Sequence, residues 1–325
     1  MRRPVSPPVS FRILLCEFLL VVVLSAYAAC AHAGGPSELR IGYQKSSVNL
    51  LIARHLGSIE QHFPDTRVRW VEFTAGPQLL EALGAGSLDF GMTGDTPPIF
   101  AQAAGRDILY VGQEPPKPRS SAILVPPGSN ITSLSALRGK RVAFQKGSSA
   151  HYLVLRALQR AGLSLADIRA VYLVPADARA AFESHSIDAW AIWDPYWAAA
   201  AHSTPARVLS TAEGIADDDT FYESSRKFVE SYPQTVQTLL GAINEAEHYA
   251  RGHRDEVSGW VATAAGLEPE AATTFLARRS ASPVDTLSPA TIARQQAVAD
   301  AFVKEGLLPH QINVNDAVWH PKEIS

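Results

Sequence analysis

Hydroxyl, amide and glycine residues gather in this sequence where predicted strands pass into predicted helices. Three of these corners lie at 43–49 (YQKSSVN), 93–98 (TGDTPP) and 144–151 (FQKGSSAH). The first backbone N–H groups of a helix have no partner within it and carry partial positive charge, which favours a bound anion. Serine and threonine hydroxyls at the same corners add donors. The pattern predicts noncovalent binding of a small anion.

A fourth corner contributes aromatic rings and a carboxylate. Residues 187–192 (IDAWAI) have the length and composition of a buried strand, and Trp193, Asp194, Pro195 and Tyr196 follow it. Proline at this place is tolerated in the first turn of a helix. Two rings and one carboxylate therefore stand at the carboxyl end of a strand, where open α/β sheets bind small ligands.

Ordinary structural roles compete with ligand binding at the hydroxyl-rich corners. Ser46 or Ser47 can be a plain N-cap of the following helix, and taken alone that interpretation is favoured. Asp95 can pair with a cationic group of a ligand or cap its own helix, and the cap is the simpler role. His151 is as well explained by a surface or capping position as by a ligand contact.

The aromatic corner leaves a similar choice. Trp193 stands at the strand end, where its ring can form the wall of a cleft, whereas Trp197 is interpreted as a core residue. Asp194 is placed to cap the helix that Pro195 begins. Tyr196 adds a hydroxyl donor.

Signatures of catalysis and metal binding are not found. The sequence has no G-x-S-x-G, H-E-x-x-H or G-x-x-x-x-G-K-[ST] motif, and its ten histidines lack metal-ligand spacing. The segment 84–86 (GAG) follows a predicted helix and precedes a strand, so it is interpreted as a helix stop. We expect no metal, no cofactor and no enzymatic activity.

The first 33 residues predict a secretory signal peptide. Three arginines precede the apolar run 13–24, and Ala31-His32-Ala33 supplies a small-x-small cleavage signal. Cleavage removes both cysteines, Cys16 and Cys30, so the exported protein must be stable without a disulfide. The alternative is lipid attachment at Cys30, but Tyr27 fits a lipid-attachment signal poorly. We expect a periplasmic protein.

Composition bounds the size of the mature protein and its partners. Removal of residues 1–33 leaves 26 basic and 31 acidic side chains, which changes the net charge from −3 to −5. A mildly acidic chain argues against broad nucleic-acid binding. Any bound anion must therefore be held by local geometry. The residues after position 33 suffice for about two domains.

Short apolar runs alternate with helical stretches from 39 to 209, as in stacked βα units. Strands are predicted at 39–43, 68–73, 89–93, 108–112, 122–125, 141–144, 170–174, 189–193 and 207–209. After about Glu223 only helices are predicted, at about 236–243, 256–265, 269–279 and 289–305. The pattern predicts mostly parallel sheets flanked by helices, with a helical C-terminal segment that returns to the first lobe.

Two crossings are expected between two lobes. The outgoing one lies at 122–126, before the stiff Pro126-Pro127-Gly128, and the returning one at about 210–221. The expected division is a first lobe of 34–124 and 213–325 and a second lobe of 125–212. Two crossings make a hinge, which is the architecture of proteins whose lobes close around a ligand.

Four segments in order resemble the aliphatic-sulfonate-binding proteins of ABC importers. They are 40–45 (RIGYQK), 94–98 (GDTPP), 137–143 (LRGKRVA) with Gly147-Ser148, and 188–190 (DAW) with 193–196 (WDPY). The resemblance covers nearly the whole chain after position 33. It implies a two-lobed periplasmic binding protein fold of class II type, and a cleft at the matching positions: Gln44, Ser46, Gly94, Asp95, Thr96, Gly147, Ser148, His151, Trp193 and Asp194.

The same resemblance implies a function and its alternatives. It implies capture of an alkanesulfonate by a monomer that delivers it to a membrane permease. Binders of taurine, nitrate and thiamine precursors belong to the same wider family, so these ligands stay open. The aromatic sulfinate desulfinases are similar in fold but use a cysteine nucleophile. A transcription-regulator effector domain lacks its DNA-binding helices here and conflicts with the export signal.

Overall fold

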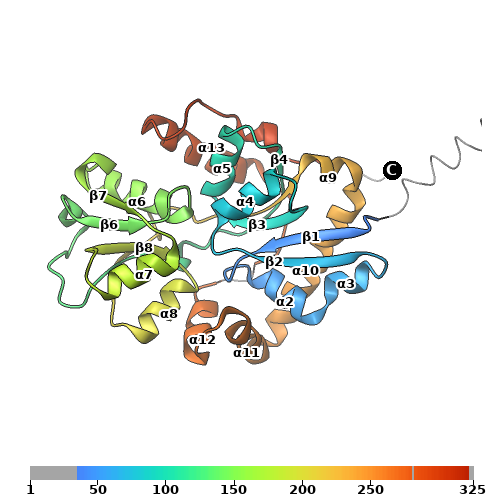
Figure 1. The fold of residues 1–325 in the computed structure, drawn as a ribbon, viewed down its shortest axis with the longest axis horizontal. Coiled ribbons are helices and arrows are strands. Elements are labelled where there is room, and N and C mark those ends of the chain that lie inside the picture. The colour runs from blue at the N-terminus through green and yellow to red at the C-terminus, as the bar shows by residue number, and fades with distance from the viewer. Residues whose placement is uncertain (1–34, 280–281, 322–325) are drawn as a thin grey trace, which may run out of the picture.

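Two five-stranded sheets, flanked by helices, form two lobes that lie side by side (Figure 1). This computed structural model describes residues 35–279 and 282–321. The predicted signal peptide, with Cys16 and Cys30, lies outside the described residues. In the described part, no helix combines the length and apolar character needed to cross a membrane.

Each sheet has one strand that runs against its neighbours. The first sheet has the order β2 (Arg67–Glu72), β1 (Glu38–Tyr43), β3 (Phe90–Gly94), β10 (Thr220–Ser225) and β4 (Ile108–Glu114). The second has the order β7 (Arg169–Tyr172), β6 (Arg141–Phe144), β8 (Ala189–Trp193), β5 (Ser121–Val125) and β9 (Arg207–Thr211). Strands β10 and β5 pair antiparallel with both neighbours, while β1 with β2 and β3, and β6 with β7 and β8, pair parallel. Both sheets are therefore mixed, and four of the five strands in each run in the same direction, as the prediction of mostly parallel sheets requires.

All nine predicted strands are present, and the structure adds β10. The sequence of β10, TFYESS, carries a glutamate and two serines, which hide its strand character in a hydropathy pattern. In the sheet Glu223 and Ser224 are buried, and each makes a hydrogen bond: Thr93 Oγ1 donates to Glu223 Oε1 at 2.6 Å, and Ser224 Oγ donates to the Asp89 carbonyl at 2.6 Å. Burial raises the pKa of Glu223 well above its usual value.

Helices cover the faces of both sheets (Figure 1). Those of the first lobe are α2 (Val48–Leu56), α3 (Ser58–His62), α4 (Gly76–Gly84), α5 (Thr96–Ala103), α9 (Arg226–Ser231), α10 (Pro233–Gly252), α11 (Arg254–Ala265), α12 (Pro269–Ala277) and α13 (Pro289–Lys304). Those of the second are α6 (Ser149–Arg160), α7 (Pro175–Glu183) and α8 (Tyr196–Ser203). Val236, Leu239 and Ile243 of α10 share a core with Leu50 of α2, so this C-terminal helix packs on the first lobe.

The outgoing crossing lies earlier than expected. Ser121–Val125 is strand β5 of the second sheet, so the chain leaves the first lobe between Glu114 and Ser121 rather than at 122–126. The prolines and glycine at 126–128 end β5 inside the second lobe. The return runs between Thr211 and Thr220, within the expected range. The crossings are bonded together, because the Lys117 N–H donates to the Asp218 carbonyl at 3.2 Å.

Candidate functional site

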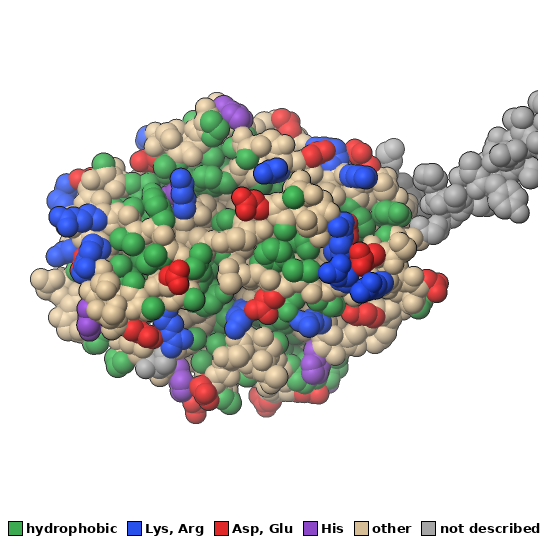
Figure 2. All heavy atoms as spheres, in the orientation of Figure 1, with side chains coloured by type: hydrophobic (Ala, Val, Ile, Leu, Met, Phe, Trp, Pro, Cys, Tyr) green, Lys and Arg blue, Asp and Glu red, His purple; other side chains and the backbone are tan. Residues whose placement is uncertain are grey.

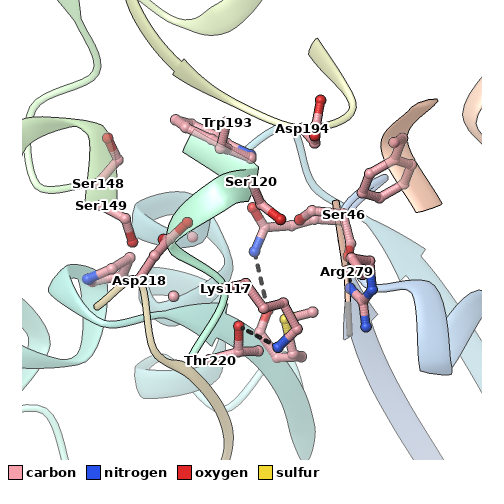
Figure 3. Close-up of a pocket in the computed structure, with 16 residues that line it drawn as sticks. Ser46, Lys117, Ser120, Ser148, Ser149, Trp193, Asp194, Asp218, Thr220 and Arg279 are labelled. Carbon is pink, nitrogen blue, oxygen red and sulfur yellow. Dashed lines mark hydrogen bonds between the residues drawn. The ribbon is translucent and has the colours of Figure 1, made fainter. Parts of the chain in front are cut away.

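A cleft between the lobes collects the ends of strands from both sheets (Figure 3). Its enclosed volume is about 70 Å³, and its mouth is open to solvent. Its lining consists of Gln44, Ser46, Gly76, Met92, Gly94, Pro97, Lys117, Ser120, Ser148, Ser149, Trp193, Asp194, Asp218, Thr220, Phe275 and Arg279. Six of the ten positions expected in the cleft are among these residues.

The first corner, between β1 and α2, brings Gln44 and Ser46 to the cleft as expected. Ser47 is the N-cap of α2 but makes no side-chain cap bond, and its Oγ accepts the Gln44 N–H at 3.0 Å. The Gln44 amide donates to the Met92 carbonyl at 3.0 Å. Lys45 turns away from the cleft, because its Nζ donates to the Ala265 carbonyl at the end of α11 at 2.8 Å.

At the second corner Gly94 and Pro97 reach the cleft, whereas the expected Asp95 and Thr96 do not. A Cβ at Gly94 would lie 2.2 Å from Ser149 Oγ of the other lobe, so glycine permits this close approach. Asp95 and Thr96 are buried behind it, and Thr96 Oγ1 donates to Asp95 Oδ1 at 2.8 Å. Burial, with the nearby charge of Asp218, raises the pKa of Asp95 to about 7.

The third corner, between β6 and α6, brings Ser148 to the cleft but not Gly147 or His151. Ser148 is the N-cap of α6 without a side-chain cap bond, since its Oγ donates to the Gln145 carbonyl at 2.8 Å. Gly147 lines a separate hollow between the lobes. His151 is fully buried, and its Nδ1 accepts the Gly147 N–H at 3.2 Å.

The environment of His151 keeps its ring away from the cleft lining. Its ring stacks on Phe144, with ring centroids 5.0 Å apart, and lies at 5.0 Å from Phe302 of the other lobe. Burial, reinforced by the charge of Lys146, lowers the pKa of His151 to about 4. The imidazole is therefore a neutral part of an interlobe core.

The fourth corner places both expected residues in the cleft. Trp193 is half-buried and its ring meets Tyr196 edge to face at 5.8 Å. Asp194 accepts the Ala198 N–H at 3.0 Å, which is the predicted capping role, and it also pairs with Arg278 at 2.9 Å. Burial outweighs these partners and raises the pKa of Asp194 to about 6.

Two cations that the sequence did not single out line the cleft around one shared carboxylate. Glu114 is fully buried and lies 2.8 Å from Lys117 Nζ and 3.1 Å from Arg279 Nη2. Burial alone would raise the pKa of Glu114, but the two cations hold it below its usual value. Burial also lowers the pKa of Lys117, against the opposing charge of Glu114. The cluster of Glu114, Lys117 and Arg279 carries a net positive charge, while the Asp218 carboxylate, which also lines the cleft, lies near Lys117.

The crossings themselves supply three further lining residues: Ser120, Asp218 and Thr220. Asp218 has φ 57°, a left-handed conformation that is rare outside glycine and that often marks a functional position. Ser121 Oγ donates to its carboxylate at 2.7 Å, and burial raises the pKa of Asp218 to about 6. Thr220 accepts a bond from Lys117 Nζ at 3.3 Å.

A signal for some of the missed residues was present in the sequence. Lys117 follows the predicted strand 108–112 between prolines, at the carboxyl end of a strand. Asp218 lies in a run of three aspartates at the predicted return. Arg279 follows a helix far along the chain, and no local pattern marks it.

The lining can hold an anion that carries an apolar group. Lys117, Arg279 and the start of α6 offer charged and N–H donors, while Trp193 and Phe275 offer apolar surface. Asp194 and Asp218 line the cleft and Asp95 lies behind it. Burial raises the pKa of all three carboxyl groups, and such perturbed groups are typical of functional sites. Within residues 35–279 and 282–321, no group of three or more His, Cys, Asp or Glu side chains is placed to hold a metal ion.

Comparison with known proteins identifies the family. The family model described as NMT1/THI5 like matches residues 67–257. The chain belongs to this family. It is 42% identical to a putative aliphatic sulfonates-binding protein of Escherichia coli, over 93% of this chain and 94% of that protein. It is 33% identical to a protein of the same description from Bacillus subtilis, over 92% and 93%. The predicted resemblance to the aliphatic-sulfonate-binding proteins is confirmed.

Solved structures agree with this family and with the two-lobed fold. The alkanesulfonate-binding protein SsuA from Xanthomonas axonopodis, bound to MOPS, superposes with a TM-score of 0.86 at 47% identity, over 88% of this chain and 99% of that one. The periplasmic aliphatic sulphonate binding protein SsuA from Escherichia coli gives a TM-score of 0.82 at 43% identity, over 90% and 94%. The periplasmic binding protein fold is confirmed. The desulfurization enzyme DSZB, 17% identical with a TM-score of 0.64, shares the fold alone.

Proposed function

We propose that this protein is the solute-binding component of an ABC importer and captures alkanesulfonates in the cleft between its lobes. The observation that carries the proposal is the pair of cleft cations, Lys117 and Arg279, which share the single carboxylate of Glu114. The relatives named for aliphatic sulfonates support the ligand class. On this proposal an anion supplies the negative charge that the cluster lacks.

The chemistry of a sulfonate suits this lining. A sulfonate stays anionic at physiological pH and offers three acceptor oxygens but no proton. Cationic and N–H donors can satisfy all the oxygens of such a group, whereas a protonated phosphate would also need acceptors for its proton. We infer that the sulfonate faces Arg279, Lys117 and the α6 start, and that Trp193 and Phe275 cover the organic part.

We propose that the cleft binds its ligand without catalysis. The close relatives are named as binding proteins rather than enzymes. The sulfinate desulfinases that this fold resembles use a cysteine nucleophile, and both cysteines of this chain, Cys16 and Cys30, lie in the predicted signal peptide. Taurine is the alternative ligand, because a taurine-binding periplasmic protein of Escherichia coli is 26% identical over 69% of this chain.

We further propose a periplasmic monomer whose lobes close about the two crossings. In this proposal the first lobe comprises 35–114 and 220–321 and the second comprises 121–211, so the boundary moves from the expected 124 to the start of β5. Closure around the ligand creates the form that a membrane permease receives. On the face shown in Figure 2, acidic and basic side chains are interspersed over both lobes.

A thermal-shift screen tests the proposal. A ligand that binds only the folded state raises the melting temperature, and the rise grows with the logarithm of the ratio of its concentration to its Kd. Butanesulfonate, MOPS, taurine, nitrate, sulfate and a pyrimidine should be compared at equal concentration. The proposal predicts larger shifts with butanesulfonate and MOPS than with taurine, nitrate, sulfate or the pyrimidine. Shifts with nitrate or the pyrimidine alone would overturn it.

A further inference from the structure

Arg278 forms an ion pair that joins the two lobes beside the cleft. It follows α12 of the first lobe, and its Nη1 lies 2.9 Å and 3.0 Å from the two carboxylate oxygens of Asp194 in the second lobe. The Asp194 side chain is fully buried and the Arg278 side chain is 15% exposed. Helices α8 and α12 face each other at this edge of the molecule (Figure 1).

The same guanidinium also stacks on an aromatic ring of the second lobe. Its central carbon lies 3.3 Å from the ring centroid of Trp197, which is buried. Such a stacked cation adds attraction to the ion pair and fixes the plane of the guanidinium. Arg278 therefore contacts the second lobe twice, through a carboxylate and through a ring.

Arg278 does not belong to the lining of the cleft in the described chain, although Asp194 and Arg279 do. Its effect on a ligand must pass through Asp194 and the spacing of the lobes. We propose that Arg278 is a positioning residue, a latch whose pairing with Asp194 and Trp197 holds the two lobes closed over the bound ligand. This inference rests on the proposed function, because it assumes a ligand that the closing lobes enclose.

The latch has a kinetic consequence. When the lobes separate, Arg278 and Asp194 part and each is hydrated. When they close, the pair forms and adds to the stability of the liganded state. Loss of the latch should therefore speed ligand release far more than it slows association. Because Arg278 does not line the cleft, its loss should raise the dissociation rate constant by the same factor for every sulfonate, whatever its organic group.

Stopped-flow tryptophan fluorescence with MOPS and with butanesulfonate measures both rate constants. In Arg278→Met the dissociation rate constant should rise by roughly 10- to 100-fold for both ligands, since the buried Asp194 loses its partner in the closed form. Arg278→Lys keeps the positive charge but loses the planar guanidinium that stacks on Trp197. Its dissociation rate constant should lie between those of Arg278→Met and wild type. Arg226→Met is the matched control, because it breaks an ion pair of 2.7 Å with Asp107 inside the first lobe. Its dissociation rate should stay within about twofold of wild type.

A double-variant cycle separates a latch from a general structural role. In the Asp194→Asn background, Arg278→Met should change the dissociation rate by less than about threefold. The melting temperature of ligand-free Arg278→Met should stay near that of wild type.

Three results would overturn the latch while leaving the proposed function intact. They are a wild-type dissociation rate in Arg278→Met, equal effects of that substitution with and without Asp194, and a slower association with unchanged release. Absence of binding of both sulfonates to wild-type protein would overturn the proposed function and the latch with it.

Discussion

Replacing Arg279 by methionine should weaken sulfonate binding without unfolding the protein. Arg279 is 7% exposed and donates to Glu114 at 3.1 Å and to the Ser46 carbonyl at 3.3 Å. Without it, Glu114 keeps Lys117 at 2.8 Å and the Asn49 amide at 3.0 Å, so this carboxylate is not left alone. The charge of the cluster falls from positive to neutral. A hydrogen bond to a charged group contributes about 1.5 to 3 kcal/mol, so Kd should rise roughly 10- to 140-fold.

Isothermal titration calorimetry with butanesulfonate measures this change, and urea unfolding shows whether the fold persists. Arg40→Met is a suitable control. Arg40 forms an ion pair of 2.6 Å with Asp89, and neither residue belongs to the cleft lining. Its Kd should stay within about twofold of wild type. Arg279→Lys keeps the charge and should recover part of the loss. An unchanged Kd in a folded Arg279→Met would refute the assignment of this side chain to the anion.

Three further substitutions test separate parts of the site. Trp193→Ala should weaken long alkanesulfonates more than methanesulfonate, by up to about 0.8 kcal/mol for each methylene that loses its cover, in calorimetric titrations along a chain-length series. A loss independent of chain length would place the ring in the core instead. His151→Leu removes the acceptor of the Gly147 N–H and should cost about 1 to 3 kcal/mol of unfolding free energy, while Kd stays within about twofold. A large change in Kd would show that His151 takes part in ligand binding after all. Burial raises the folded-state pKa of Asp95 to about 7, above its ordinary value, so ionised Asp95 destabilises the fold at high pH and this cost disappears as pH falls toward 4. In urea unfolding Asp95→Asn should therefore be more stable than wild type at pH 8, with an advantage that shrinks toward pH 4.5, and an advantage that grows in acid would contradict this.

The sequence predicted the strands and the corners of the site because both depend on local patterns. Buried runs such as 189–193 mark strands by composition, and parallel strands bring their carboxyl ends to one edge. Strand β10 was not predicted because its glutamate suggests an exposed segment, whereas in the sheet Glu223 is buried and one of its oxygens accepts a bond from Thr93 of the neighbouring strand. A local sequence pattern predicts which apolar residues are buried, but it does not show which distant residue provides a hydrogen bond to a buried polar group.

The error at His151 has a geometric cause. Ser148 is the N-cap of α6 and faces the cleft, whereas His151 lies in the first turn of the helix. A helix turns about 100° per residue, so a polar residue one turn in can face the core. Arg279 could not be predicted, because its place at the cleft depends on the return of the C-terminal helices to the first lobe.

The most direct test of the central claim is a crystal structure of the protein with butanesulfonate. The account predicts the ligand between the two lobes, with sulfonate oxygens within hydrogen-bond distance of Arg279 and of the N–H groups that begin α6. The alkyl chain should lie against Trp193. A ligand bound outside this cleft, or a sulfonate turned away from Lys117 and Arg279, would contradict the account.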